Sequence, residues 1–264
     1  SFGVYQITKE DTKRCVLDAI KSGYRGIDTA QSYLNESEVG DAIVECGVPR
    51  EELFITTKVW IDHYGYEECK ASVEESLRKL KTDYLDLCLL HQPFSDYYGA
   101  YRALEDLYAE GKIKAIGISN FSAERMADIA TFNRIVPAVN QVETHMFWQQ
   151  YELHGWMEKY NIQHEAWGPL AQHRLKEVIE HPVVKEIALK YGKEPVQIAL
   201  RHHVQRGIVV IPKSIHKDRM KQNLDIFDFK LFDEDMEQLK KLDENKSMWA
   251  EYDDPMIVQY AMEE

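Results

Sequence analysis

The chain has 264 residues, of which 44% are hydrophobic, and its formal net charge at neutral pH is −13. This apolar content is enough for a large core without disulfide bonds or a structural metal. The acidic balance argues against nucleic acid and anionic membranes, so we expect neither as a partner. A bound anion would need a local cluster of Lys and Arg side chains.

Cysteine usage and the lack of targeting signals indicate a cytoplasmic protein. No apolar run approaches membrane-spanning length, and no signal peptide is visible. The motif His164-Glu165 lacks a second His at zinc-binding spacing, so we expect no metal. The cysteines are too far apart for a CxxC pair, which suits a reducing compartment; they are Cys15, Cys46, Cys69 and Cys88.

Short β-like runs alternate with amphipathic helical runs along the whole chain. In chain order, the predicted strands are residues 3–5, 25–28, 53–57, 84–90, 115–119, 138–142, 162–166 and 208–211. Examples of the helical stretches that follow them are residues 12–22, 66–81, 98–110, 123–132 and 195–206. A last helical run, 233–242, precedes a polar tail that we expect to fold over one end of the molecule.

Eight such units in about 250 residues predict an α/β protein with one closed (β/α)8 TIM barrel, spanning residues 1–264 as a single domain. A doubly wound open sheet is the alternative. That fold would favour a Gly-rich phosphate turn after the first strand, and the chain has no GxGxxG motif. No Pro/Gly/Ser-rich linker divides the chain.

Reactive side chains follow three successive predicted strands. Asp28 ends the second strand and Tyr33 lies in the loop after it, Lys58 ends the third strand, and His91 ends the fourth. Barrel enzymes place their chemistry at the carboxyl ends of the strands. Because neighbouring strands lie about 4.8 Å apart, these side chains can meet at one point.

The combination predicts a general acid for carbonyl reduction. A free Tyr has a pKa of about 10, and a cation beside the phenol lowers it, so we expect Lys58 to make Tyr33 more acidic. Asp28 can hold Lys58 in place, and His91 can hydrogen-bond a substrate carbonyl. No side chain supplies a hydride, so the reaction requires a nicotinamide cofactor.

Each residue alone has a simpler interpretation. Asp28 could be a helix cap, Tyr33 a packing residue and His91 a core histidine. Lys58 stands between Thr57 and Val59, where an unpaired ammonium would be costly, but a structural ion pair would satisfy it. Only the combination at successive strand ends favours catalysis.

Six separated motifs resemble the aldo-keto reductase superfamily, in the family's order and over essentially the whole chain. The resemblance is closest to a microbial and protozoal group that includes diketogluconate reductases and prostaglandin F synthases. It implies the barrel, NADPH dependence and a catalytic set of Asp28, Tyr33, Lys58 and His91. The motifs are residues 23–36, 57–60, 90–93, 117–121, 139–143 and 211–214.

The resemblance also implies a nicotinamide site. Ser119, Asn120 and Gln141 match residues that hydrogen-bond the carboxamide, and Trp167 matches the aromatic residue that stacks on the ring. The loop that approaches the pyrophosphate would contain Leu170 and Gln172.

Lys213, Ser214 and Arg219 match the group around the adenosine 2′-phosphate, and Asn223 matches an adenine contact. Residues 211–219 hold three formal cations against one anion, after the last strand, where barrels commonly bind phosphate. A solvated helix start is the other interpretation of this charge. With the resemblance, the pattern favours NADP over NAD.

Several features depart from the family pattern. The usual leading β-hairpin is absent before Ser1, residues 171–178 form a short pyrophosphate loop, and Gln222 replaces a common Glu. Gln92 stands where a Trp often follows the catalytic His. We expect the substrate wall to comprise Tyr5, Trp60, Gln92 and Trp249.

The leading hypothesis is therefore NADPH-dependent reduction of a small aldehyde or ketone by a monomer or weak oligomer. One alternative is a cofactor-binding regulatory barrel without turnover. Another is a barrel glycosidase that uses Asp28 and Glu143, which would leave Lys58 unexplained. Methylglyoxal, diketo sugars, aromatic aldehydes and a prostaglandin endoperoxide all remain open as substrates.

Overall fold

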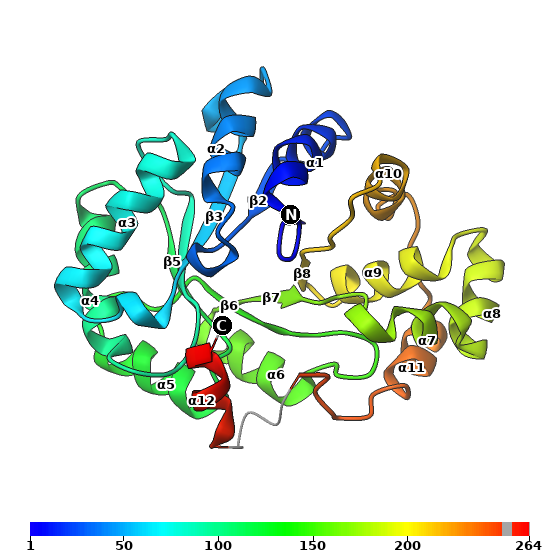
Figure 1. Cartoon of the computed structure of the whole chain (residues 1–264). Helices are drawn as coiled ribbons and strands as arrows, with labels where there is room; N and C mark the ends of the chain where they lie inside the picture. The colour runs from blue at the N-terminus through cyan, green and yellow to red at the C-terminus, as the bar shows by residue number, and fades with distance from the viewer. Residues whose placement is uncertain (250–254, 264) are drawn as a thin grey trace.

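The computed structural model describes residues 1–249 and 255–263. Its centre is an eight-stranded parallel sheet in which the strands follow one another in sequence order (Figure 1). This arrangement confirms the predicted α/β fold of the (β/α)8 type. The strands are β1 (Phe2–Gly3), β2 (Gly26–Asp28), β3 (Phe54–Val59), β4 (Leu87–Leu90), β5 (Ile116–Ser119), β6 (Val139–Glu143), β7 (Gln163–Trp167) and β8 (Val209–Val210).

The sheet curls, so that its first and last strands come near each other. In the described part of the chain no ladder pairs β8 with β1. The backbone N–H of Gly3 donates to the carbonyl of Pro212 at 3.3 Å, and the Ser1 amino group donates to the carbonyl of Val210 at 3.2 Å. These bonds join the two edges at this seam.

Helices cover the outside of the sheet (Figure 1). They are α1 (Lys9–Lys21), α2 (Glu36–Glu45), α3 (Tyr66–Leu80), α4 (Tyr97–Ala109), α5 (Ala123–Phe132), α6 (Tyr151–Tyr160), α7 (Leu175–Glu180), α8 (Pro182–Tyr191), α9 (Pro195–Gln205), α10 (Lys217–Leu224), α11 (Asp233–Lys240) and α12 (Met256–Glu263). Short 3-10 turns are η1 (Gln31–Tyr33), η2 (Arg50–Glu52), η3 (Ile61–His63) and η4 (Gln172–Arg174). Every helix among the described residues is too short or too polar to cross a bilayer.

Local sequence signals explain where several helices begin. The Thr8 side chain caps α1 by accepting from the backbone N–H of Asp11, and Ser122 caps α5 in the same way. Glu194 and Gln197 form a reciprocal capping box at the start of α9, next to Pro195. A polar cap before an amphipathic run therefore sets these helix starts.

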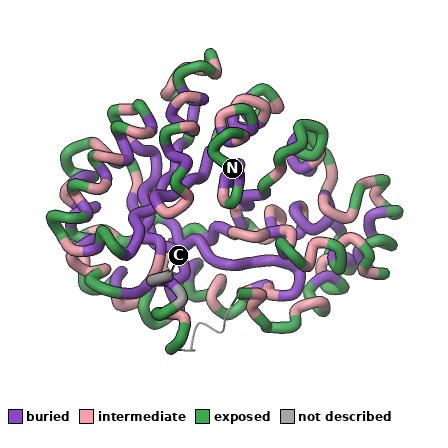
Figure 2. The backbone as a smooth tube through the Cα atoms, in the orientation of Figure 1, coloured by how far each residue is buried: buried purple, intermediate pink, exposed green. Residues whose placement is uncertain are grey.

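The core lies between the strands and the inner faces of the helices, as the buried purple tube in Figure 2 shows. All residues of β4 and β5 are buried. In β5, a Cβ atom on Gly117 would meet the Val139 backbone carbonyl at 2.7 Å. Glycine at this position therefore permits the close approach of β5 to β6.

Strand boundaries differ from the predicted ones by at most three residues, and the ends at Asp28, Leu90 and Ser119 agree. The largest difference is in the predicted strand 84–90, because β4 begins only at Leu87. Leu85 forms an isolated bridge with Ile113, and the Asp86 carboxylate accepts from the Ile55 backbone N–H and pairs with Arg50. The backbone still pairs here, because the Asp86 N–H donates to the Ile55 carbonyl and the Leu85 N–H to the Lys112 carbonyl, but the continuous ladder begins only at Leu87.

Candidate active site

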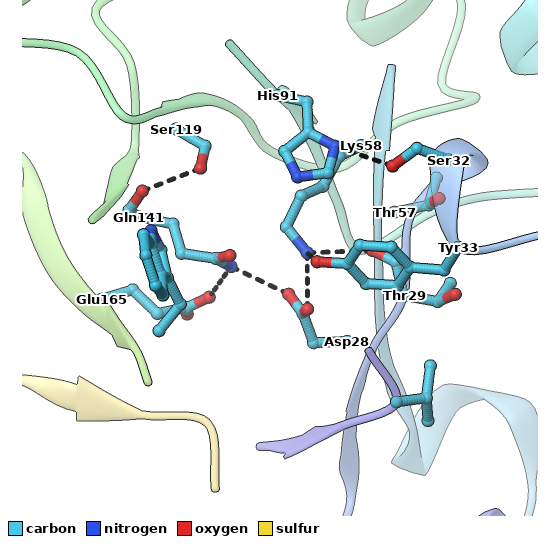
Figure 3. A network of polar contacts seen from close by, with 12 residues as sticks. Asp28, Thr29, Ser32, Tyr33, Thr57, Lys58, His91, Ser119, Gln141 and Glu165 are labelled. Atoms are coloured by element: carbon cyan, nitrogen blue, oxygen red, sulfur yellow. Dashed lines mark hydrogen bonds and ion pairs between the residues drawn. The ribbon is translucent and has the colours of Figure 1, made fainter. Parts of the chain in front are cut away.

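The buried side chain of Lys58 stands at the centre of a polar network at the strand ends (Figure 3). Its Nζ atom lies 2.5 Å from Asp28 Oδ1, 3.0 Å from the carbonyl oxygen of Thr29 and 3.3 Å from the Tyr33 hydroxyl oxygen. Asp28 ends β2, Lys58 lies in β3, and Tyr33 lies in η1 directly after β2. The structure therefore brings together three of the four residues predicted to be catalytic.

Electrostatics keep Lys58 charged in this setting. Burial by itself would lower the pKa of the ammonium, but the Asp28 carboxylate and the Tyr33 oxygen outweigh burial, and the net shift is upward. The ammonium also donates three hydrogen bonds, so none of its charge is left without a partner.

The acidity of Tyr33 differs from the expectation. We predicted that Lys58 would lower the pKa of the phenol below that of a free tyrosine, but burial raises it to about 12. Lys58 does act in the predicted direction, and burial of the phenolate outweighs it. Tyr33 is therefore protonated at neutral pH, which is the state that a proton donor needs.

His91 follows β4 and lies near the phenol. Its ring centroid is 5.7 Å from that of Tyr33 and 4.9 Å from that of Trp60, and its Nδ1 atom is 3.5 Å from the Ser32 hydroxyl. Burial, and then the charge of Lys58, hold the pKa of the imidazole well below its usual range. His91 is therefore a neutral imidazole that can donate one hydrogen bond.

A cavity of about 820 Å³ opens beside this network. It runs from Tyr33 and His91 to Lys213. Among the residues predicted for the cofactor and substrate sites, its wall includes Tyr5, Gln92, Ser119, Asn120, Gln141, Trp167, Leu170, Gln172, Lys213 and Trp249.

Polar side chains on the cavity wall are already ordered by hydrogen bonds. The Ser119 hydroxyl donates to the backbone carbonyl of Gln141 at 2.8 Å, and the Trp167 indole N–H donates to Asn120 Oδ1 at 2.8 Å. The Asn120 amide donates to the His91 backbone carbonyl at 3.1 Å. These bonds connect the predicted nicotinamide residues to one another and to His91.

The residues predicted around the 2′-phosphate and adenine lie further out. Ser214 accepts a hydrogen bond from the His216 backbone N–H, Arg219 is exposed on α10, and Asn223 is buried near the end of that helix. These three are not among the described residues that line the cavity. The same holds for Trp60, which the structure puts against His91 instead.

Sequence reasoning missed several residues of this region. Phe94 lines the cavity, and α12 contributes Ile257 and Ala261 to its wall. The tail was expected to cover one end, but no periodic signal identified α12. Glu165 was quoted only within a motif, although it is buried and receives a hydrogen bond from Gln141. No group of His, Cys, Asp and Glu side chains in the described ranges could hold a metal ion.

Sequence comparisons agree with this geometry. Residues 1–244 match the sequence model of the Aldo/keto reductase family. A glyoxal reductase of Bacillus subtilis is 46% identical over 246 residues, covering 92% of this chain and 88% of the relative. A methylglyoxal reductase, DkgA, of Escherichia coli K12 is 40% identical over 95% of this chain and 91% of its own length. A 9,11-endoperoxide prostaglandin H2 reductase of Trypanosoma cruzi is 42% identical, with 92% and 86% covered.

Solved structures extend the likeness to three dimensions. An aldo-keto reductase from a Medee basin deep-sea metagenome library superposes with a TM-score of 0.94 at 43% identity, covering 96% of this chain and 94% of that chain. An aldo-keto reductase of Bombyx mori in complex with NADP has a TM-score of 0.89 at 31% identity, with 98% and 92% covered. The chain is therefore an oxidoreductase enzyme of the aldo/keto reductase family.

Proposed function

We propose that the protein reduces an aldehyde or ketone to an alcohol with NADPH, and that Tyr33 donates the proton. The observation that carries this proposal is the 3.3 Å contact between the Lys58 ammonium and the Tyr33 hydroxyl, beside His91 and open to the cavity. A structural ion pair alone would need Asp28 and Lys58 but would not need a phenol at the cavity wall.

The roles of the side chains follow from their protonation states. Tyr33 is protonated at neutral pH and can pass its proton to a carbonyl oxygen as negative charge develops there. Lys58 stabilises the phenolate that remains, and Asp28 holds Lys58 in position. His91, as a neutral donor, can orient the same carbonyl.

The residues of the cavity fit a nicotinamide dinucleotide. When bound, the nicotinamide supplies the hydride. Ser119, Asn120 and Gln141 would hold the carboxamide, and Trp167 would cover the ring. Leu170 and Gln172, which also line the cavity, would approach the pyrophosphate.

Selectivity for the 2′-phosphate would come from charge. Lys213, Ser214 and Arg219 would meet this phosphate, and Asn223 the adenine. A local cationic group in a chain of net charge −13 favours NADPH over NADH. The relative from Bombyx mori, crystallised with NADP, supports the same choice.

The test is the loss of NADPH absorbance with a panel of aldehydes, for wild type and Tyr33→Phe. We expect turnover in the wild type and a loss of about 10²–10⁴-fold in the variant, with NADPH affinity retained. Tyr101→Phe is the matched control, because it removes a buried hydroxyl that bonds the Ile135 carbonyl far from the site.

Other outcomes would favour the alternatives. If the wild type and both variants bind NADPH but none of them turns over, the result would indicate a regulatory barrel. A protein that binds neither NADPH nor NADH would contradict the proposal altogether, and tighter binding of NADH would contradict the role of Lys213 and Arg219.

A further inference from the structure

A second buried carboxyl lies inside the barrel, next to the residues proposed for proton transfer. Glu165 occupies the middle of β7 and is only 5% exposed. The proposed transfer of a proton from Tyr33 does not use it. A buried carboxyl needs a partner or a changed protonation state, so its surroundings decide what it does.

Gln141 connects this carboxyl to Asp28 (Figure 3). Its amide nitrogen donates to Asp28 Oδ2 at 2.8 Å and to Glu165 Oε1 at 2.7 Å. Both carboxyl groups therefore contact one nitrogen atom. The two bonds fix the orientation of the Gln141 amide at the cavity wall.

The charge of Glu165 depends on groups from several elements. Burial, and then the Asp28 carboxylate on β2, raise the pKa of Glu165 to about 7. The Gln141 hydrogen bond from β6, the Ser1 amino group before β1 and Lys58 on β3 act in the opposite direction. Glu165 is therefore neutral in mildly acidic solution and charged in mildly basic solution.

We infer that Glu165 is a positioning residue for carbonyl reduction, which orients Gln141 against Asp28 and adds a removable negative charge beside the Asp28–Lys58 pair. The inference rests on the proposed function. With Glu165 neutral, one carboxylate balances the Lys58 ammonium. With Glu165 ionised, the excess negative charge disfavours a phenolate on Tyr33 and slows proton donation.

The experiment is single-turnover oxidation of bound NADPH by an aromatic aldehyde, from about pH 6 to about pH 8.5. We expect the wild-type rate to fall about threefold to tenfold over this range, to a lower plateau. Glu165→Gln, which keeps the shape and stays neutral, should remove this step and keep the rate of the acidic plateau. Glu165→Asp should keep a step.

Glu36→Gln is the matched control. Glu36 is also buried with a raised pKa, but it accepts from the Thr57 hydroxyl at 2.7 Å. Thr57 and Lys58 are successive residues of β3, so their side chains point to opposite faces and Glu36 lies outside the barrel. The Glu36→Gln profile should follow the wild type.

An active Glu165→Gln enzyme with the wild-type pH profile would overturn the inference and leave the proposed function intact. The same holds if Glu36→Gln removes the step equally well. Should Glu165→Gln fail to fold, a wild-type rate that stays level over the range would overturn the inference, and so would an unchanged midpoint in Glu165→Asp. A midpoint that moves in Glu165→Asp would support it. If the wild type does not turn over at any pH, the proposed function fails and the role of Glu165 falls with it.

Discussion

Two buried groups of titratable side chains in this barrel avoid an unpaired buried charge in opposite ways. Around Lys58, each polar atom has a partner, and Asp28 accepts from both Lys58 and Gln141. On α9, His202 and His203 are fully buried with ring centroids 5.3 Å apart, and within the described chain none of their ring nitrogens has a hydrogen-bond partner.

The difference follows from charge at neutral pH. An ammonium stays charged and must be paired when buried, whereas an imidazole can give up its proton. Burial, and then the charge of Arg206, lower the pKa of His202 to about 3, and burial holds the pKa of His203 well below its usual range. The charged group around Lys58 can therefore take part in proton transfer. The two histidines are neutral core residues whose packing acid can disturb.

The largest expected effect comes from breaking the paired group. Lys58→Met leaves the Asp28 carboxylate buried without its cation, so the free energy of unfolding should fall by about 3–5 kcal/mol. Reductase activity should be lost as well. Urea unfolding at neutral pH measures the first effect, and NADPH oxidation measures the second.

The double variant Asp28→Asn/Lys58→Met is the control for this loss. It removes both charges, so it should recover much of the stability while remaining inactive. Wild-type stability in Lys58→Met alone would show that the buried Asp28 carboxylate does not need its cation.

A smaller effect should appear at the unpaired histidines in acid. The pKa of His202 is about 3 in the folded protein and about 6.5 in the unfolded chain, so the unfolded chain binds the proton first. Stability from this group is complete above about pH 6.5 and falls as the pH drops toward 3. At about pH 5 the loss is about 2 kcal/mol.

His202→Leu should remove this part of the acid sensitivity, and urea unfolding at two pH values measures it. His63→Leu, at an exposed position, should lose as much stability in acid as the wild type. Equal acid losses in His202→Leu and the wild type would contradict the assignment.

The smallest expected effect is at an exposed ion pair. Lys13 and Glu45 pair on the surface, with side chains 38% and 54% exposed. Water already solvates both charges, so Glu45→Gln should leave the melting temperature unchanged within about 1 °C. A clear drop in the melting temperature would show that exposed ion pairs also stabilise the fold, and it would weaken the contrast between buried and exposed charge.

The strand order was predictable because each βα unit leaves a local pattern in the chain. Apolar runs such as the one ending at Leu90 indicated buried strands, and amphipathic runs such as residues 123–132 indicated helices. Strand ends were less predictable. The contacts of Asp86 with Ile55 and Arg50 are tertiary, so no local signal shortens the run that begins at residue 84.

The candidate site divides in the same way. Asp28, Lys58 and Tyr33 were predictable because strand ends of one barrel edge must meet. The pKa of Tyr33 was not predictable, because burial outweighs Lys58 there and a sequence gives no measure of desolvation. Glu165 was missed for a similar reason, since its link to Asp28 runs through Gln141, 113 residues away from Asp28 in the chain.

Asn120 constrains how this protein can evolve. It adopts a left-handed backbone with φ of 64°, and its side chain joins the segments that carry His91 and Trp167. A new residue there would need to tolerate that backbone and replace all three side-chain bonds at once, including the one to Gln92. Trp249 and Ile257 line the cavity from separate segments. Under the proposed function, substrate preference can therefore diversify at those two positions one substitution at a time, while Asn120 keeps His91 and Trp167 in place.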